Sequence, residues 1–419
     1  MTVVGGARPR IAVYYPSFAH WGGAERLALQ TAAALAEEHD VVLCAEDVPS
    51  PDALSAYFGI DLSRVEVRPL TPGGPLTARI VGPRTRVRRW RYAVLRWSHG
   101  RQLARTPADL LVSVAPSPPI ACRHPLGVYS CFFPAGDETE SFGRGPAARA
   151  YHGACRLLER ALLGSRSQAL DSWDAVIACS QYTAMWIDRL WDRTAVVVPP
   201  PCDDMGPPGT KEPWVLSVGR FQPPTTTAPS KSFEAIIEAF RLLHRRSGQA
   251  VELHLAGHCA DDDASRAYLQ RLRDAADGLP VVFHVSIDHD ELRDLYRRSA
   301  LFWLATGFGF DPARLPGKQE HFGIVTVEAM SAGAIPLLYA SGGSVDIIGD
   351  HGVGALWTSI EELVSASLAI LSDEQEARRQ AARCAELARA YAPEEFARRT
   401  REAVNAVLGA TAPLAVPRP

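Results

Sequence analysis

Residues Lys318–Gly343 read KQEHFGIVTVEAMSAGAIPLLYASGG. A short helical pattern in this stretch ends at the small residues SAG, and the apolar run IPLLYA follows as a strand pattern. Continuous apolar strands that alternate with helices are typical of parallel sheets buried on both faces. Glu320 stands before the helical pattern and Glu328 lies in its second turn. The stretch therefore predicts an α/β unit with two carboxylates around the start of one helix.

The same alternation of apolar runs and helical patterns extends through both halves of the chain. It predicts a doubly wound α/β sheet in each half. The predicted strands lie at residues 11–15, 40–46, 65–70, 109–115, 127–133, 175–180, 195–200, 214–219, 251–257, 281–286, 300–305 and 334–340. A long helical stretch runs from Ser359 to about Leu408 and restarts at Pro393, because proline suits a first helical turn.

The Pro- and Gly-rich stretch PPPCDDMGPPGTKEP, from Pro199 to Pro213, indicates a linker between two domains. We predict an N-terminal domain over residues 1–206 and a C-terminal domain over 207–390. We expect residues 391–410 to form a helix that packs back toward the first domain, and residues 411–419 to be a disordered tail.

The bulk composition is that of an ordinary globular protein. Of 419 residues, 47% are hydrophobic and 22% are charged, and the net charge of −3 gives no general attraction to nucleic acid. The eight cysteines include no CxxC pair, so we expect reduced thiols, most of them in the core, in a cytoplasmic protein. The N-terminus lacks an apolar signal region, and no apolar run approaches the ~20 residues that span a bilayer.

Doubly wound sheets bind ligands at the carboxyl ends of their strands, so we expect a cleft between the two domains to hold the site. Gly22 and Gly23 follow the first strand and open a helix, a place suited to an anion, although a tight turn gives the same pattern. In the second domain Arg220 ends a strand and Lys231 opens the next helix. They form a plausible clamp for a diphosphate or are solvated surface cations. Only three of the 44 basic residues are lysines, which makes Lys231 more informative.

The two glutamates complete this predicted site. Glu320 is expected in a loop that faces the cleft. Glu328 is either an exposed helix residue or a carboxylate that binds the two vicinal hydroxyls of a ribose. The acidic stretches ADDDAS (260–265) and CDDM (202–205) are better explained as turns or helix caps than as a metal site.

The segment Arg79–Arg105 carries nine arginines with Trp90, Tyr92 and Trp97 between them. This pattern is typical of helices that bind an anionic membrane surface, and a solvated charged helix shows it as well. Nucleic-acid binding is the weaker alternative in a chain that is acidic overall.

Together these residues resemble the retaining glycosyltransferases of family 4, which have the GT-B fold. The resemblance covers most of the chain and rests on "GGAER", "IACSQYTAMWIDRLW", "VGRF" with the following lysine, and the pair of glutamates eight positions apart. The form "EHFGI" is most similar to the GDP-mannose-dependent α-1,2-mannosyltransferases of lipid-linked oligosaccharide assembly.

The resemblance implies a role for each matching position. Arg220 and Lys231 would neutralise the donor diphosphate, and Glu328 would bind the nucleotide ribose. Glu320 and the segment His321, Phe322, Gly323 and Ile324 would hold the donor sugar, while Gly22 and Gly23 would approach the phosphates from the other domain. No metal or other cofactor is implied, because the nucleotide sugar is the co-substrate.

The resemblance also implies an acceptor, either a glycan, a lipid-linked sugar or a small molecule. Many relatives carry a histidine in the loop after the strand at 127–133, where this chain has Phe132 and Phe133. Asp137 and Glu138 follow in that loop and are candidates for the acceptor side. Two alternatives stay open: an epimerase of the same fold that acts on a UDP-sugar, and an inactive scaffold that only binds.

Overall fold

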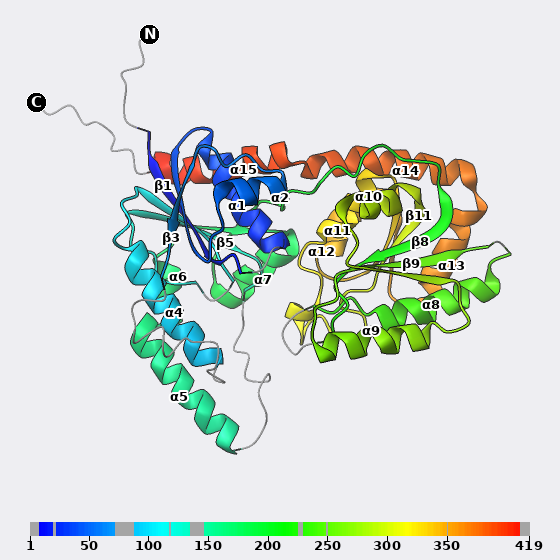
Figure 1. Cartoon of the computed structure of the whole chain (residues 1–419), viewed down its shortest axis with the longest axis horizontal. Helices are drawn as coiled ribbons and strands as arrows, with labels where there is room; N and C mark the ends of the chain where they lie inside the picture. Colours follow the sequence, from blue (N-terminus) through cyan, green and yellow to red (C-terminus); the bar gives the residue numbers. More distant parts are fainter. Residues whose placement is uncertain are drawn as a thin grey trace, which may run out of the picture. The chain divides into compact units, whose positions relative to one another are not determined.

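The computed structural model describes residues 8–19, 22–71, 88–116, 119–134, 146–224, 229–248, 250–349 and 351–410. These residues form two compact units, shown in Figure 1. The first unit contains the chain up to Cys179, Thr183–Val198 and the chain from Phe396 onward, and the second contains Ser180–Tyr182 and Pro199–Glu395. The main change of unit therefore falls at the start of the Pro- and Gly-rich stretch, a few residues before position 206. The predicted tail at 411–419 lies outside the described residues.

The described part of the first unit is built on a seven-stranded parallel sheet in the order β3-β2-β1-β4-β5-β6-β7. Its strands are β1 (Arg10–Ser17), β2 (Asp40–Glu46), β3 (Val65–Pro69), β4 (Leu110–Val114), β5 (Leu126–Cys131), β6 (Ala175–Ala178) and β7 (Val196–Val197). The strand predicted at 195–200 is thus reduced to two residues. Three consecutive prolines begin at Pro199, and proline has no N–H to donate to a sheet.

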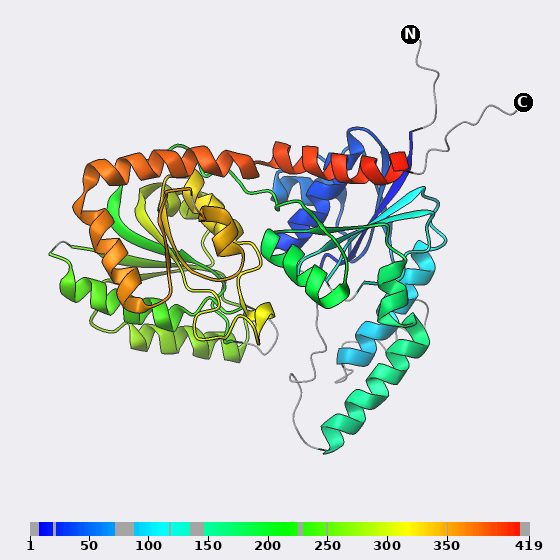
Figure 2. The same cartoon turned by 180° about the vertical axis from the view of Figure 1, so that it is seen from behind.

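Both faces of this sheet are buried, as the sequence predicts. Alternate residues of β1 belong to two different hydrophobic clusters: Ile11 and Val13 pack on one side, and Ala12 and Tyr14 on the other. The helices are α1 (Gly23–Ala36), α2 (Pro51–Phe58), α4 (Arg88–Leu103), α5 (Pro146–Leu163), α6 (Arg166–Asp171), α7 (Gln181–Trp191) and α15 (Pro393–Ala410). Helices α4 and α5 lie side by side in Figures 1 and 2.

The described part of the second unit contains a six-stranded parallel sheet in the order β10-β9-β8-β11-β12-β13. The strands are β8 (Glu212–Val218), β9 (Glu252–Gly257), β10 (Val281–Val285), β11 (Ser299–Leu304), β12 (Ile335–Tyr339) and β13 (Ala355–Trp357). The sequence patterns missed β13, because three residues between glycines and a helix are too short to show a period. The other five strands match their predictions within two residues at either end.

The second unit also contains helices, and the prediction of one continuous helical stretch after Ser359 is wrong. They are α8 (Phe233–Arg246), α9 (Asp263–Ala275), α10 (His289–Arg298), α11 (Ile324–Ser331), α12 (Gly343–Ile348), α13 (Ile360–Ser372) and α14 (Glu374–Ala388), with 3-10 turns at Pro316–Lys318 and Arg389–Tyr391. The helical stretch that begins near Ser359 is broken at Asp373, whose carboxylate accepts a hydrogen bond from Glu376 N and so starts α14. The predicted restart at Pro393 is confirmed by α15.

Strand order confirms the predicted fold class. In each sheet the chain builds three strands in one direction, returns to the middle and builds the rest in the other direction. The order reverses between β1 and β4 in the first unit and between β8 and β11 in the second. Ligands of doubly wound sheets bind beyond the carboxyl ends of the strands at this reversal.

Candidate functional site

Three of the charged residues predicted for the second unit lie at its strand-order reversal. Arg220 is exposed two residues after β8 ends, and Lys231 precedes α8 at the other end of the same loop. Glu320 lies in the loop that follows β11. The carboxyl ends of β8 and β11 are adjacent because the two strands pair in parallel. The fold therefore brings together the two loops that carry these charges.

Lys231 and Glu320 form an ion pair inside this cluster. Lys231 Nζ donates a hydrogen bond of 2.6 Å to Glu320 Oε2, and the two side chains are 24% and 12% exposed. Burial favours a raised pKa for Glu320, but the Lys231 ammonium outweighs it and holds that pKa below the usual range. The lysine at this helix start thus has a carboxylate partner, and a Cβ at Gly219 would collide with its aliphatic chain. The pair presents an ammonium at the place where a diphosphate is expected.

The backbone of Glu320 is held by the glycine-rich loop before α12. Gly343 N donates a hydrogen bond of 2.7 Å to the Glu320 carbonyl oxygen. Gly342 has a φ of +66°, and a Cβ there would clash with that same oxygen. Gly342 and Gly343 are therefore required for the close approach of two loops, one before α11 and one before α12.

Glu328 is fixed by a tyrosine from a neighbouring helix. Tyr296 Oη on α10 donates a hydrogen bond of 3.1 Å to Glu328 Oε2, and the Tyr296 side chain is fully buried. Glu328 itself is half-buried, so the alternative of an exposed helix residue does not hold. An oriented carboxylate one turn inside α11 is well placed to accept hydrogen bonds from a ligand's hydroxyl groups.

A short segment with a left-handed glycine leads into α11. The helix begins at Ile324, with Gly323 as its N-cap at a φ of +108°, so His321 and Phe322 lie outside it. Phe322 is buried against Tyr391, with ring centroids 5.5 Å apart. Burial lowers the pKa of His321, which favours a neutral imidazole near pH 7. The hydroxyls of Thr326 and Ser344, within the described residues, are buried without a hydrogen-bond partner, so the two helix starts contain polar groups that a ligand can satisfy.

The other two lysines also occupy specific positions. Lys211 Nζ donates hydrogen bonds to the carbonyl oxygens of Ala332, at 2.8 Å, and Tyr296, at 3.3 Å. Burial lowers the pKa of Lys211 to about 7. Lys318 is buried with its ammonium 5.7 Å from the centre of the Phe310 ring. Lys211 therefore caps the C-terminal end of α11. The sequence patterns missed this role, and the scarcity of lysine was the one signal that pointed to it.

In the first unit the two predicted glycines lie at the start of α1. Gly22 is the N-cap and Gly23 the first helical residue. The neighbouring Glu25 carboxylate accepts a hydrogen bond of 2.6 Å from Tyr15 Oη at the end of β1. The placement is that of the predicted strand-to-helix loop at the carboxyl end of β1.

A buried polar chain at the same sheet edge escaped the sequence analysis. Tyr14 Oη lies 3.0 Å from His99 Nδ1, and His99 Nε2 lies 2.9 Å from Glu46 Oε1. Tyr14 and His99 are almost fully buried, and Glu46 ends β2 with part of its carboxylate exposed. His99 comes from α4, so the three residues are distant in sequence and no motif links them. They present a carboxylate, supported by an imidazole, at the ligand-binding edge of this sheet.

The loop that departs from the family pattern is only partly described. Phe132 is half-buried against the core of the first unit, and its carbonyl oxygen lies 3.5 Å from Thr183 Oγ1. Asp137 and Glu138 lie outside the described residues, so their assignment to the acceptor side stays a prediction. His124 precedes β5, and its Nε2 lies 3.1 Å from the carbonyl oxygen of Thr106.

The acidic stretches behave as turns and caps. Asp262 caps α9 through a 2.8 Å hydrogen bond from Ser265 N, and Asp204 accepts one from Gly206 N. In the described ranges no cluster of three or more metal-ligating side chains occurs. The helices found in those same ranges are all too short or too polar to span a bilayer.

Two protein families match the chain, one in each half. Residues 21–205 match the family described as Glycosyltransferase Family 4, and residues 206–389 match Glycosyl transferases group 1. Together the two matches begin after β1 and include Gly22, Gly23, Arg220, Lys231, Glu320 and Glu328.

A curated relative supports the same grouping. A GDP-Man:Man(3)GlcNAc(2)-PP-Dol alpha-1,2-mannosyltransferase of Xenopus laevis is 32% identical over 219 residues, which are 48% of this chain and 41% of the relative. The matched region thus spans less than half the length of that relative.

Solved structures extend the likeness to the whole fold. A sucrose-phosphate synthase from Thermosynechococcus elongatus covers 96% of this chain and 100% of its own, with a TM-score of 0.65 at 18% identity. HepE from Anabaena, solved in complex with UDP and glucose, covers 95% of this chain and 100% of its own, with a TM-score of 0.63 at 16% identity. With two parallel sheets of doubly wound order and a family match in each half, the chain belongs to the family 4 glycosyltransferases of the GT-B fold.

Proposed function

We propose that this protein transfers a hexose, with mannose as the best candidate, from a nucleotide diphosphate sugar to a hydroxyl group of its acceptor. The observation that carries the proposal is the Lys231–Glu320 pair beside Arg220 at the strand-order reversal of the second unit. GDP is the favoured nucleotide because the relative matched above is named for GDP-mannose. UDP is the alternative, because HepE was solved with UDP.

The donor diphosphate is proposed to lie against Lys231 and Arg220. Two cations that face a departing diphosphate stabilise the negative charge that develops on its oxygen, which is electrostatic catalysis. The Glu320 carboxylate keeps the Lys231 ammonium in place before the donor arrives. Its second oxygen is proposed to accept a hydrogen bond from a sugar hydroxyl. The Glu328 carboxylate, oriented by Tyr296, is proposed to accept hydrogen bonds from the two ribose hydroxyls.

Retention at the anomeric carbon is proposed through a front-side reaction. The bond between the anomeric carbon and the diphosphate oxygen breaks, and the acceptor oxygen bonds to the same face of the sugar. The acceptor proton passes to the leaving phosphate oxygen, so the step needs no protein nucleophile. Glu320, the carboxylate beside the proposed diphosphate site, is paired with Lys231 and is a poor candidate for one.

The acceptor is proposed to be a lipid-linked glycan held at an anionic membrane surface, at the inner face of the cytoplasmic membrane. The support is the arginine-rich segment Arg79–Arg105, of which α4 takes in Arg88 to Leu103. Near an acidic surface each basic residue contributes about 1 kcal/mol. The test is co-sedimentation with vesicles that contain or lack anionic lipid, with Arg86, Arg88, Arg89 and Arg91 changed to Gln in the variant. Equal sedimentation of the two proteins rejects membrane docking and favours a soluble acceptor.

A panel of nucleotide sugars tests the donor proposal. A ligand that binds only the native state raises its unfolding temperature. We expect GDP-mannose to stabilise the wild type most and to stabilise Lys231→Ala much less. The proposal is rejected if no nucleotide sugar shifts the transition, or if the two proteins respond equally.

The stereochemistry and the competing activity are tested with the donor that stabilises the protein. NMR of the product is expected to show the anomeric configuration of the donor. An inverted product refutes the front-side step. Conversion of a UDP-sugar into its epimer without transfer would favour the epimerase alternative.

A further inference from the structure

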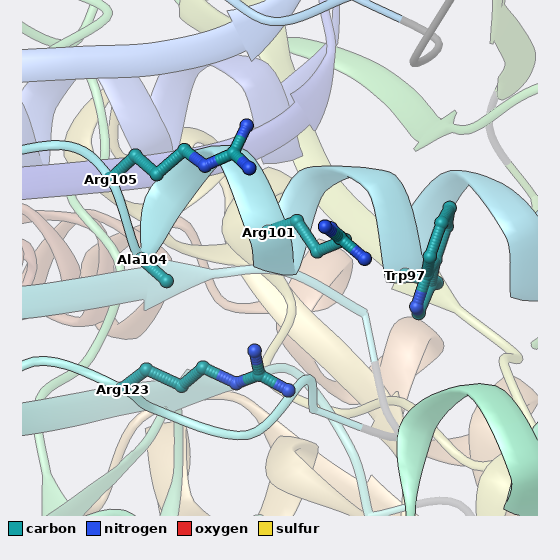
Figure 3. A pocket seen from close by; sticks show the side chains of 5 residues that line it. All are labelled: Trp97, Arg101, Ala104, Arg105 and Arg123. Carbon is teal, nitrogen blue, oxygen red and sulfur yellow. The ribbon is translucent and has the colours of Figure 1, made fainter.

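A pocket in the first unit is lined mostly by arginines. Its volume is about 350 Å³, within the range of small-molecule sites, and it is bounded by Trp97, Arg101, Ala104, Arg105 and Arg123 (Figure 3). Arg101 extends from the last turn of α4, Arg105 from the turn that follows it, and Arg123 from the segment before β5. Three guanidinium groups from two separate segments thus line one hollow.

The pocket is placed at the amino ends of the strands. Arg105 lies between α4 and β4, and Arg123 lies in the segment that enters β5. Because β4 and β5 are parallel neighbours, the segments that enter them meet at the edge opposite the one where doubly wound sheets bind ligands. The pocket is therefore separate from Gly22, Gly23 and the carboxylate of Glu46.

The two arginine-bearing segments are tied together by His124. Its Nε2 lies 3.1 Å from the Thr106 carbonyl oxygen, so the residue after Arg123 contacts the residue after Arg105. Burial lowers the pKa of His124, which keeps the imidazole neutral at physiological pH. The relative position of the two arginines is thus set by the fold before any ligand binds.

The charges in the pocket are not neutralised by the described part of the chain. The five lining residues include no carboxylate, and in the described ranges neither Arg105 nor Arg123 forms an ion pair or a side-chain hydrogen bond. Arg101 packs over the Trp97 ring, with its guanidinium carbon 5.0 Å from the ring centroid. That contact orients the guanidinium without using its N–H donors for a hydrogen bond.

The end of α4 is the negative end of its helix dipole, so an anion in the pocket must be held by the charges of the arginines. Arg101 in the last turn favours the negative end of the helix dipole, which explains one arginine but not Arg123 from another segment. The nearby carbonyl oxygens are already used. Those of Gly100, Gln102 and Leu103 accept hydrogen bonds from backbone N–H groups, and that of Thr106 is bonded by His124.

We propose that this pocket is a binding site for a phosphoryl group, carried either by a soluble phosphate compound or by a phospholipid headgroup. Arginine forks match phosphate oxygens in paired hydrogen bonds, and three of them suit a diphosphate or a phosphate monoester. Arg101 and Arg105 also belong to the arginine-rich segment Arg79–Arg105 proposed to meet a membrane. Arg101 lies about 18 Å along α4 from Arg89 at 1.5 Å per residue, so the pocket uses other arginines than those changed in the membrane test.

The test compares a triple variant, Arg101→Gln, Arg105→Gln and Arg123→Gln, with a charge-matched control, Arg245→Gln, Arg246→Gln and Arg378→Gln. All six arginines are exposed, so both variants are expected to fold like the wild type, which thermal unfolding verifies. The probe is inorganic pyrophosphate in titration calorimetry. A third protein, Lys231→Ala, removes the proposed donor site and leaves the pocket intact.

We expect two pyrophosphate sites in the wild type and the control, and one in the triple variant. Each lost charged hydrogen bond weakens binding by about tenfold or more, so the pocket's affinity should fall by at least about a hundredfold. Lys231→Ala should keep the pocket site. If the donor proposal fails and the pocket binds phosphoryl groups, the wild type shows one pyrophosphate site. The control and Lys231→Ala keep that site, and the triple variant loses it.

Vesicles that contain phosphatidic acid separate the two sources of the phosphoryl group. Loss of vesicle binding in the triple variant, but not in the control, assigns the site to a lipid headgroup. Loss of pyrophosphate binding with unchanged vesicle binding assigns it to a soluble compound. If the triple variant matches the control with both probes, the pocket is not a phosphoryl site and the proposal is overturned.

Discussion

The ion pair between Lys231 and Glu320 gives the most direct test of the site, because its effect on stability does not depend on the identity of the substrate. The perturbation is Glu320→Gln, which keeps the shape of the side chain and removes its charge. The Lys231 ammonium is then left about three-quarters buried without its carboxylate. A buried charge that loses its partner destabilises the folded state more than the pair itself contributed.

The magnitude follows from the geometry. At 2.6 Å the attraction is roughly 6 kcal/mol for an effective dielectric constant of about 20, before any desolvation cost is subtracted. Desolvation of Glu320 opposes most of it, and hydrogen bonds to charged groups retain about 1.5–3 kcal/mol. We therefore expect Glu320→Gln to lower the unfolding free energy by about 1.5–3 kcal/mol at pH 7. The double variant with Lys231→Met should lose less than the sum of the two single losses.

The assay is urea unfolding of the wild type, both single variants and the double variant, at pH 7 and at pH 4. The pKa of Glu320 is lower in the folded protein than its ordinary value of 4.5, so its contribution is complete above pH 4.5 and is lost as pH falls through the folded pKa. The difference between wild type and Glu320→Gln should therefore shrink in acid. Strictly additive losses at pH 7, or a difference that grows in acid, would refute the pairing.

Three further predictions concern the same unit. Glu328→Ala should weaken donor binding about ten- to a hundredfold in calorimetry, and Tyr296→Phe by a smaller factor, because only the orienting hydroxyl is lost; unchanged affinity in both removes the ribose assignment. Arg220→Ala and Lys231→Ala should lower the transfer rate more than acceptor affinity, since their charges act as the diphosphate departs; a loss confined to acceptor binding places them elsewhere. Lys211 has a folded pKa of about 7 against an ordinary 10.5, so the unfolded state binds the extra proton between these values and stability rises with pH there. Lys211→Met should remove up to about 1.4 kcal/mol per pH unit of that rise, and parallel curves for the two proteins would exclude the shift.

The sequence by itself determined the two sheets. Apolar runs such as "VVLCAE" and "LFWLA" are continuous because both faces of each strand are buried. Such a run can be recognised from neighbouring residues alone. Local patterns also located the loops that carry Arg220, Lys231 and Glu320, since each follows a strand or opens a helix. The three-residue β13 and the break at Asp373 escaped detection, because so short an element or interruption leaves no period to detect.

Only the tertiary structure decided which of these side chains meet. Lys231 and Glu320 are 89 positions apart, and they pair because β8 and β11 are neighbours in the sheet, a fact about strand order that no local pattern encodes. The same holds for His99, which α4 brings between Tyr14 and Glu46. Hydrophobic periodicity reports which face of an element is buried. Polar contacts between distant segments require the order and register of the strands, which are fixed only when the whole sheet packs.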